Sequence, residues 1–324
     1  MRRTLLALAA ILPLAACTKR KEHKEAPAPA VAKTVAPAQP DRDEVALVSP
    51  GSEPRAPLRY HFAAGAKSQL DITMDLAMKS ADLPAAALGT LPSPRFRLAM
   101  EITDVAADGT ATLRSTILGV GAIDQPGEKV KAAAMQDKLA LMTGLAFVAK
   151  VSPSGVVTDS TVAPGAKVPP ELAPQLEQLH NVLQQVVLAL PVEPIGKDGQ
   201  WKVTKRVAQQ GLAMTVVTTF KLTDVKADAF SFAGTTEQHA VPAAGTASGP
   251  HVIGLDGHGD ATGTVELGAP AMSYELKSQI TTTVGADDKP QHMSLDLGVH
   301  VVALPPGSDQ PITAGSAQGA QSAP

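Results

Sequence analysis

The sequence predicts a mainly β protein with minor α: a large curved antiparallel sheet, or half-barrel-like β domain, with one or two amphipathic helices packed on it. Three observations predict this class. Segments in which apolar and polar residues alternate recur along the chain, turn-forming residues separate them, and a single long stretch has strong helical periodicity. Strands joined by short turns pair antiparallel, so the alternating segments are expected to form one extended sheet with a buried and a solvated face.

The first element is an export signal. Met1-Arg2-Arg3 is a basic start, and the apolar stretch TLLALAAILPLAA that follows is too short to span a bilayer as a helix. It ends in LAAC at residues 14–17, which resembles the lipobox of bacterial lipoproteins. The resemblance implies cleavage before Cys17, which then carries diacylglycerol and an N-linked acyl chain such as palmitate. The alternative is an ordinary secretory signal with a stray cysteine, but Cys17 is the only cysteine of the chain and has no disulfide partner.

Lipidation predicts a protein anchored to the cell envelope rather than one that spans a membrane. The segment TKRKEHK after Cys17 is basic and suits contact with anionic headgroups, or else is a plain linker start. Thr18 stands where an Asp favours inner-membrane retention in enterobacterial lipoproteins. The outer membrane, on its periplasmic side or at the cell surface, is therefore the expected location.

Composition divides the rest of the chain. Alternating Ala and Pro predict that residues 17–57 form the lipid anchor and a disordered tether, after a signal peptide at 1–16. A Gly/Ser/Ala/Gln-rich tail at 305–324 is also expected to be disordered. The β-rich domain then spans 58–304.

Two strands are especially clear. In 70–79 every second residue is apolar, and the same holds for 95–105. The residues expected to point inward are Leu70, Ile72, Met74, Leu76, Met78, Phe96, Leu98, Met100 and Ile102. Six further segments rich in Thr and Val follow: TATLRSTILGV, AMTVVTTFKLTDV, AFSFAGTTEQHAV, ATGTVELG, MSYELKSQITTTV and HMSLDLGVHVVAL.

Helical periodicity appears twice. Residues 171–190 place leucine and valine at steps of three and four and end before Pro191. A weaker stripe contains Met135, Leu139 and Met142. The concave face of the sheet is the expected partner of both stripes, and a surface for a protein partner or a dimer is the alternative for the longer one.

A duplicated turn suggests an internal repeat. ITDVAAD at 102–108 returns as LTDVKAD at 222–228. Asp favours turns through local hydrogen bonds to the backbone, so each copy is expected to join two strands of a hairpin. The two hairpins indicate pseudo-repeated halves at about 58–160 and 200–304 with the helix between them, or else two hairpins that converged on one turn.

Catalytic motifs are scarce. The usual hydrolase, phosphate-loop and zinc-protease spacings do not occur. The strongest metal candidate is HVIGLDGHGDATG, whose His251, Asp256, His258 and Asp260 are possible ligands, although the same glycines suit a flexible turn before a strand. We therefore expect no cofactor and no enzymatic activity, with a metal-dependent enzyme as the least favoured alternative.

The composition also limits the partners. A net charge of −3 with mixed signs excludes a nucleic-acid footprint, and 3% aromatic residues argue against a stacking site for sugars or bases. The single Trp201 lies in PVEPIGKDGQW, and this Pro-x-x-Pro-Ile-Gly-x-x-Gly-x-Trp segment resembles one found in uncharacterised envelope lipoproteins of unknown function. The resemblance implies an envelope location and a β-rich domain, and it gives no information about an activity.

Methionines at strand positions suggest that the protein binds an apolar ligand. Methionine adapts to flexible apolar guests, and a curved sheet closed by an amphipathic helix is also the plan of periplasmic lipid carriers. An apolar or lipidic ligand is therefore expected in a sheet cavity, and the alternative is a structural or assembly lipoprotein that binds an envelope protein through a sheet edge or helix. The candidate lining residues are Met74, Met78, Met100, Met214 and Trp201, and the alternative is that they simply pack a core with few aromatic residues.

Overall fold

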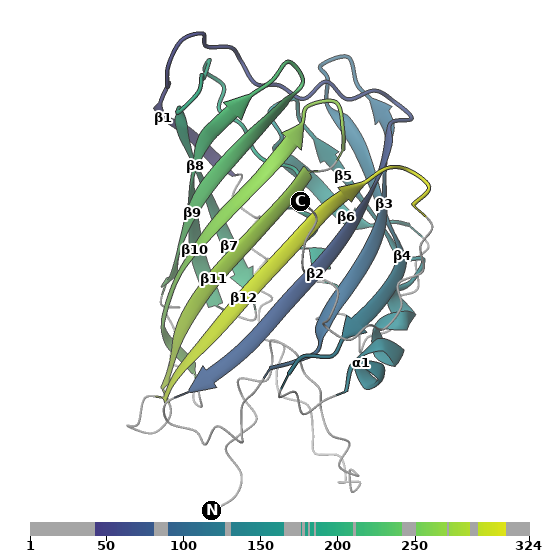
Figure 1. The fold of residues 1–324 in the computed structure, drawn as a ribbon, viewed down its shortest axis with the longest axis vertical. Coiled ribbons are helices and arrows are strands. Elements are labelled where there is room, and N and C mark those ends of the chain that lie inside the picture. The colour runs from purple at the N-terminus through teal and green to yellow at the C-terminus, as the bar shows by residue number, and fades with distance from the viewer. Residues whose placement is uncertain are drawn as a thin grey trace, which may run out of the picture.

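The computed structural model describes residues 43–80, 90–126, 131–164, 176, 179–180, 182–184, 186–209, 212–241, 251–270, 272–285 and 291–308. These residues form one twelve-stranded antiparallel sheet that curves into a deep trough (Figure 1). The order of the strands across it is β1-β7-β8-β9-β10-β11-β12-β2-β3-β4-β5-β6. The predicted fold class is confirmed. The strands are β1 Glu44–Ser49, β2 Lys67–Ser80, β3 Ser93–Val105, β4 Ala111–Ile123, β5 Ala146–Val151, β6 Val157–Val162, β7 Gln200–Gln209, β8 Leu212–Val225, β9 Ala229–Val241, β10 His251–Glu266, β11 Met272–Gly285 and β12 Gln291–Leu304.

The alternation read from β2 and β3 is confirmed. Leu70, Ile72, Leu98 and Ile102 are fully buried, and all belong to a single hydrophobic core. The register of each strand pair places these residues and the apolar residues of the other strands on the concave face. Charged and hydroxyl side chains therefore lie mainly on the convex face, as the period of two in a strand requires.

β1 corrects the predicted boundary of the tether. Residues 17–57 were expected to have no fold, yet Glu44–Ser49 pair with β7 at the edge of the sheet. Val45 and Leu47 alternate with polar or exposed positions and pack against the core opposite Val203 and Trp201. The Ala/Pro composition that predicts the tether ends just before this strand, and residues 1–42 lie outside the described part of the chain.

Both copies of the duplicated turn join adjacent antiparallel strands, and both hairpins carry an irregularity in the same place. The register shifts between Ile102 and Asp104 in the first and between Leu222 and Asp224 in the second. Ile102 and Leu222 are each fully buried. The turns differ in length, at residues 106–110 and 226–228, which explains why little sequence identity survives outside the motif.

The likeness extends to a third strand in each half. The N–H of Gly65, before β2, donates to the carbonyl of Ile102 at 2.8 Å, and the N–H of Asp198, before β7, donates to the carbonyl of Leu222 at 2.9 Å. Gly65 and Asp198 both have positive φ, at 82° and 63°. The units β2-β3-β4 and β7-β8-β9 thus begin and turn alike, which supports the hypothesis of a pseudo-repeat.

Two segments, residues 50–62 and 188–196, cross one end of the trough and are here called the strap. Ala56 and Ile195 exchange backbone hydrogen bonds of 3.2 and 3.0 Å within it. The strap also reaches the turn between β5 and β6, where Pro153 accepts from the N–H of Tyr60 and Ser154 accepts from the N–H of Leu190, both at 2.8 Å. Because β1 and β6 are the edge strands, the strap ties the two edges together at this end (Figure 1).

Close backbone contact fixes the strap to that turn. Gly155 has φ 78°, and a Cβ on it would lie 2.2 Å from the carbonyl oxygen of Leu188. Only glycine fits such a position. The hydroxyl of Tyr60 accepts from the N–H of Leu188 at 3.1 Å and donates to its carbonyl at 3.2 Å, so one phenol satisfies both backbone groups of a buried residue.

The helices are shorter than predicted. The weaker stripe forms α1, Ala132–Leu139, followed by a 3₁₀ turn over Ala140–Met142, and Met135, Leu139 and Met142 are buried as expected. In the predicted helix 171–190, helical residues among those described end at Leu183, and 186–190 are non-helical and buried. The carbonyls of Leu188 and Ala189 bond to Tyr60 and to the Trp201 indole instead of continuing the helix.

The matched hairpins give a direct test of the fold. We expect Ile102→Ala and Leu222→Ala each to lower the free energy of unfolding by about 2–5 kcal/mol, because each leaves a cavity at an equivalent buried position. Leu118→Ala, at an exposed residue of β4, should change it by less than about 0.5 kcal/mol. Urea denaturation of the three variants checks this, and an Ile102 variant as stable as the Leu118 variant would contradict it.

Candidate functional site

The concave face divides into two closely covered flanks and a less covered centre. On one flank Trp201, Leu222 and Phe232 are buried, and on the other Ile72 and Phe96 are buried. Between them, β10, β11 and β12 carry both buried inward residues, such as Val265, Val299 and Val301, and inward apolar residues that remain partly exposed. We call this set the central strip, and its members are Ala261, Tyr274, Leu276, Ile280, Leu295 and Leu297.

Register places the strip residues side by side. Leu276 lies opposite Ala261 on one neighbouring strand, and Ile280 lies opposite Leu295 on the other. Leu295 in turn lies opposite Met78 of β2, which is also partly exposed. The strip therefore runs along the strands from Tyr274, nearer the strap, towards the opposite end of the sheet. An aliphatic surface of this kind is suited to contact with an apolar molecule.

Glycines occupy several inward positions of β10, so β10 contributes few side chains to the strip. The inward positions of β10 include Gly257, Gly259 and Gly263, so the segment expected to be a flexible turn before a strand is itself the middle of a sixteen-residue strand. Side chains of adjacent strands lean over these glycines: a Cβ on Gly263 would lie 2.7 Å from the ring of Phe232, and one on Gly257 would lie 3.2 Å from Gln238. Cross-strand packing on a curved sheet thus outweighs the low strand propensity of glycine.

The predicted lining residues separate into two groups. Met74, Met100 and Trp201 are buried in the core, and Trp201 stacks on Phe220 at 5.3 Å between ring centroids. Its indole N–H donates to the carbonyl of Ala189 at 2.9 Å. Met78 and Met214 are partly exposed on the concave face, beyond the buried flanks. Of the five candidates, these two are the ones that an incoming molecule can reach without displacing the core.

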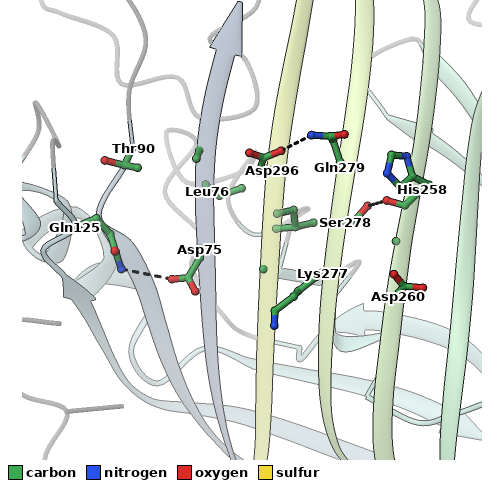
Figure 2. Close-up of a pocket in the computed structure, with 14 residues that line it drawn as sticks. Asp75, Leu76, Thr90, Gln125, His258, Asp260, Lys277, Ser278, Gln279 and Asp296 are labelled. Carbon is green, nitrogen blue, oxygen red and sulfur yellow. Dashed lines mark hydrogen bonds between the residues drawn. The ribbon is translucent and has the colours of Figure 1, made fainter. Parts of the chain in front are cut away.

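A hollow on the convex face is bordered by charged and amide side chains, although most of its lining surface is apolar. It has a volume of about 510 Å³ and crosses β2, β12, β11 and β10 (Figure 2). Asp75 accepts a 2.5 Å hydrogen bond from Ser93, and Asp296 accepts from Lys79 at 2.6 Å and from Gln279 at 3.0 Å. These carboxylates are engaged by their neighbours in the sheet, so the hollow presents a mutually neutralised surface rather than a set of groups directed at one point.

The metal candidates lie along one strand. Asp256, His258 and Asp260 alternate on the convex face of β10, and the side chain of His251 lies outside the described part. Asp256 contacts His239 of β9 at 3.0 Å. Across all the described residues, no three His, Cys, Asp or Glu side chains gather closely enough to hold a metal ion. Strand geometry explains the spread, since residues two apart on an extended strand lie roughly 6–7 Å apart.

A serine–histidine contact was not expected from the sequence. The Oγ of Ser160 lies 3.5 Å from Nδ1 of His180, and the other ring nitrogen of His180 is 2.8 Å from the amide nitrogen of Gln184. A general base activates a serine through a shorter hydrogen bond and is itself oriented by a carboxylate in the common arrangement. The contact instead ties β6 to the helical segment.

Asp71 forms the most buried ion cluster among the described residues. Arg95 donates to both of its carboxylate oxygens, at 2.9 and 2.5 Å, and Arg97 adds a contact of 2.8 Å. Burial acts to raise the pKa of Asp71, but the hydrogen bonds and charges of the two arginines outweigh it and hold the pKa below its ordinary value. The carbonyl of Ser308 accepts from Arg97 at 3.3 Å, so the start of the predicted disordered tail is fixed here.

No protein-family model matches this chain, and no curated protein matches it with significance. Within the described ranges, the search for a helix long and apolar enough to cross a membrane finds none. The resemblance of the Trp201 segment to envelope lipoproteins stays a prediction.

The Asp71 cluster predicts pH-dependent stability. We expect Asp71→Asn to lower the free energy of unfolding by about 3 kcal/mol at pH 7, because it leaves two arginines without their charged partner. Since the folded state lowers this pKa, the loss should be full above the ordinary carboxyl pKa of about 4 and should shrink as the pH falls below it. Asp104→Asn, at an exposed carboxylate, is the control for urea denaturation between pH 7 and pH 3. A loss that stays constant over this range would contradict the cluster's role.

Proposed function

We propose that the protein is a lipid-anchored protein of the bacterial cell envelope, at the outer membrane, that binds an apolar or lipidic ligand on the central strip and catalyses no reaction. The observation that carries the proposal is the strip itself. Ile72, Phe96, Trp201 and Leu222 on its flanks are buried, whereas Leu276, Ile280, Leu295 and Leu297 keep part of their surface accessible. Apolar surface left accessible in the middle of a concave face is a common property of ligand sites.

The entry of the chain into the sheet supports the same proposal. β1 begins at Glu44, which pairs with Thr204 in the middle of β7, and it runs from there towards the strap (Figure 1). Ile280 and Leu295 lie in the part of the strip farther from the strap. A tether from lipidated Cys17 would therefore reach the sheet from the side away from the strap, where these residues lie, which suits exchange of an apolar ligand with the membrane.

Docking of a protein through a sheet edge or helix is less well supported. The edge strand β6 contains Asp159 at φ 51° and a register shift against β5, and the edge strand β1 has six residues with a register shift of its own. Short, irregular edges discourage pairing with another chain. The described leucines of the helical stripe, Leu176, Leu179 and Leu183, are buried within this chain.

The ligand proposal is tested by displacement of N-phenyl-1-naphthylamine, a neutral apolar dye, from the purified protein. We expect Leu295→Glu to weaken dye binding at least about tenfold, because it places a carboxylate in an aliphatic strip. Val302→Glu is the matched control on the convex face of the same strand, at a residue that is 49% exposed. Equal dye binding by the two variants, with both folded by circular dichroism, would contradict the proposal. Lipid extracted with the wild-type protein should be detectable by mass spectrometry.

The anchor has a separate test. We expect Cys17→Ser to move the protein from the detergent phase to the aqueous phase in Triton X-114 partitioning, because the acyl chains are lost. Dye binding by this variant should match that of the wild type, since the strip lies in the sheet. A Cys17→Ser protein that stays in the detergent phase would contradict lipid anchoring at this residue.

A further inference from the structure

Among the residues of the strip, the one hydroxyl group belongs to Tyr274, at the end of the strip nearer the strap. Tyr274 lies on β11 and faces inward, opposite Gly263 of β10 and Val301 of β12. Its ring packs against the hydrophobic core, while part of the residue remains exposed. The ring of Phe232 covers Gly263, so Tyr274 stands at the point where the aromatic flank meets the partly exposed strip.

This hydroxyl has no hydrogen-bond partner in the described part of the structure. Burial raises the pKa of the Tyr274 phenol, and no hydrogen bond or charge opposes that effect. The other tyrosine of the chain, Tyr60, provides the comparison, because burial raises its pKa too, yet its hydroxyl bonds to both backbone groups of Leu188. The Tyr274 ring packs against the core while part of the residue stays accessible, so its hydroxyl can donate to an oxygen atom of a bound molecule.

The charges around the strip constrain the chemistry of that oxygen. The charged side chains of β11, Glu275 and Lys277, are on the convex face and pair with each other at 2.7 Å. The described inward positions of β10 and β12 carry no charge. The nearest inward cation on the sheet, Lys205 of β7, is neutralised by Asp43 at 3.0 Å. A carboxylate or phosphate beside Tyr274 would be buried without a counter-ion, which is strongly unfavourable.

We propose that Tyr274 donates its hydroxyl proton to an uncharged acceptor oxygen of the ligand, such as an ester carbonyl, while the aliphatic part of the ligand lies along Leu276, Ile280 and Leu295. The inference rests on the proposed function and narrows the ligand to a neutral lipid with an oxygen within an otherwise apolar body. Tyr274 is a binding residue that sets specificity.

The test compares wild-type protein with Tyr274→Phe, which removes only the hydroxyl. Three probes of similar length, methyl dodecanoate, tridecane and dodecanoate, are delivered from cyclodextrin and compete with N-phenyl-1-naphthylamine. We expect Tyr274→Phe to weaken methyl dodecanoate about fivefold, the ratio that one net hydrogen bond gives, and to leave tridecane within twofold. Dodecanoate should bind wild type no more tightly than its methyl ester. The stretching band of a ¹³C-labelled ester carbonyl should shift to lower wavenumber on wild type and not on the variant.

Tyr60→Phe serves as the matched control. It should lower the thermal midpoint, because two backbone groups lose their partner, and should leave probe affinities unchanged. Tyr274→Phe should keep or raise the midpoint without ligand, since it removes an unsatisfied hydroxyl. Equal affinity of wild type and Tyr274→Phe for methyl dodecanoate, or tighter binding of dodecanoate than of its ester, would overturn the Tyr274 inference alone. If wild type binds neither the dye nor tridecane, the proposed function itself is overturned.

Discussion

The backbone contacts of the strap are the constraint on which the rest of the structure depends. A twelve-stranded sheet with one apolar face would expose that face at both edges unless something joined them. The strap does so at one end, where it packs Leu58, Tyr60 and Ile195 into the core and bonds to the turn between β5 and β6. It fixes the curvature of the sheet, and the curvature decides which inward residues are covered. The partly exposed central strip is therefore a consequence of closure at one end.

A small number of aromatic side chains is enough for this closure because several of them cluster near the strap. Trp201, Phe220, Phe230 and Phe232 contact one another near the strap, with centroid distances of 5.3 to 6.5 Å. Glycine opposite an aromatic ring lets neighbouring strands approach and the sheet bend, as the ring of Phe232 over Gly263 illustrates. The other buried aromatic residues lie in the strap, at Tyr60 and Phe62, and on the opposite flank, at Phe96 and Phe147. The centre of the trough relies mainly on aliphatic residues, which cover it less completely.

Much of the fold could be predicted from alternation alone. β2 and β3 needed only the period of two, and the duplicated turn marked two equivalent hairpins. β1 was not predicted because its six alternating residues directly follow an Ala/Pro-rich segment. Local composition cannot show that β7, which is distant in sequence, offers an edge with which these residues pair. The second half of β10 is predicted as a strand, but its first half reads as a turn because its glycines lower strand propensity. Packing against Phe232 and Gln238 of β9 compensates for these glycines, and this contact cannot be read from local sequence. The helix 171–190 was overextended because the buried residues after Leu183 keep apolar spacing while Tyr60 and Trp201 compete for their carbonyls.

The candidate site was less accessible to sequence reasoning. Methionine at strand positions pointed to the correct face for Met78 and Met214, but nothing in the sequence distinguished them from buried Met74 and Met100. Tyr274 carried no signal, since MSYELKSQI reads as an ordinary strand. Its proposed role depends on Gly263 and Val301, which lie opposite it on β10 and β12, and on the lack of a hydrogen-bond partner for its hydroxyl among the described residues. Both features depend on a strand register that is fixed over long sequence separations.

The strand order also has a consequence for folding. β2 pairs with β12, and Lys79 there contacts Asp296, which comes 217 residues later in the chain. β1 likewise can pair only after β7 has been synthesised. Pairings this distant form slowly, because a long loop must close before the contacts repay its entropy. The central sheet therefore cannot be completed before the last strand has been synthesised. If the predicted export signal directs this chain to the envelope, such a delay favours passage to its destination in a loose, unfolded form and assembly of the trough only after arrival.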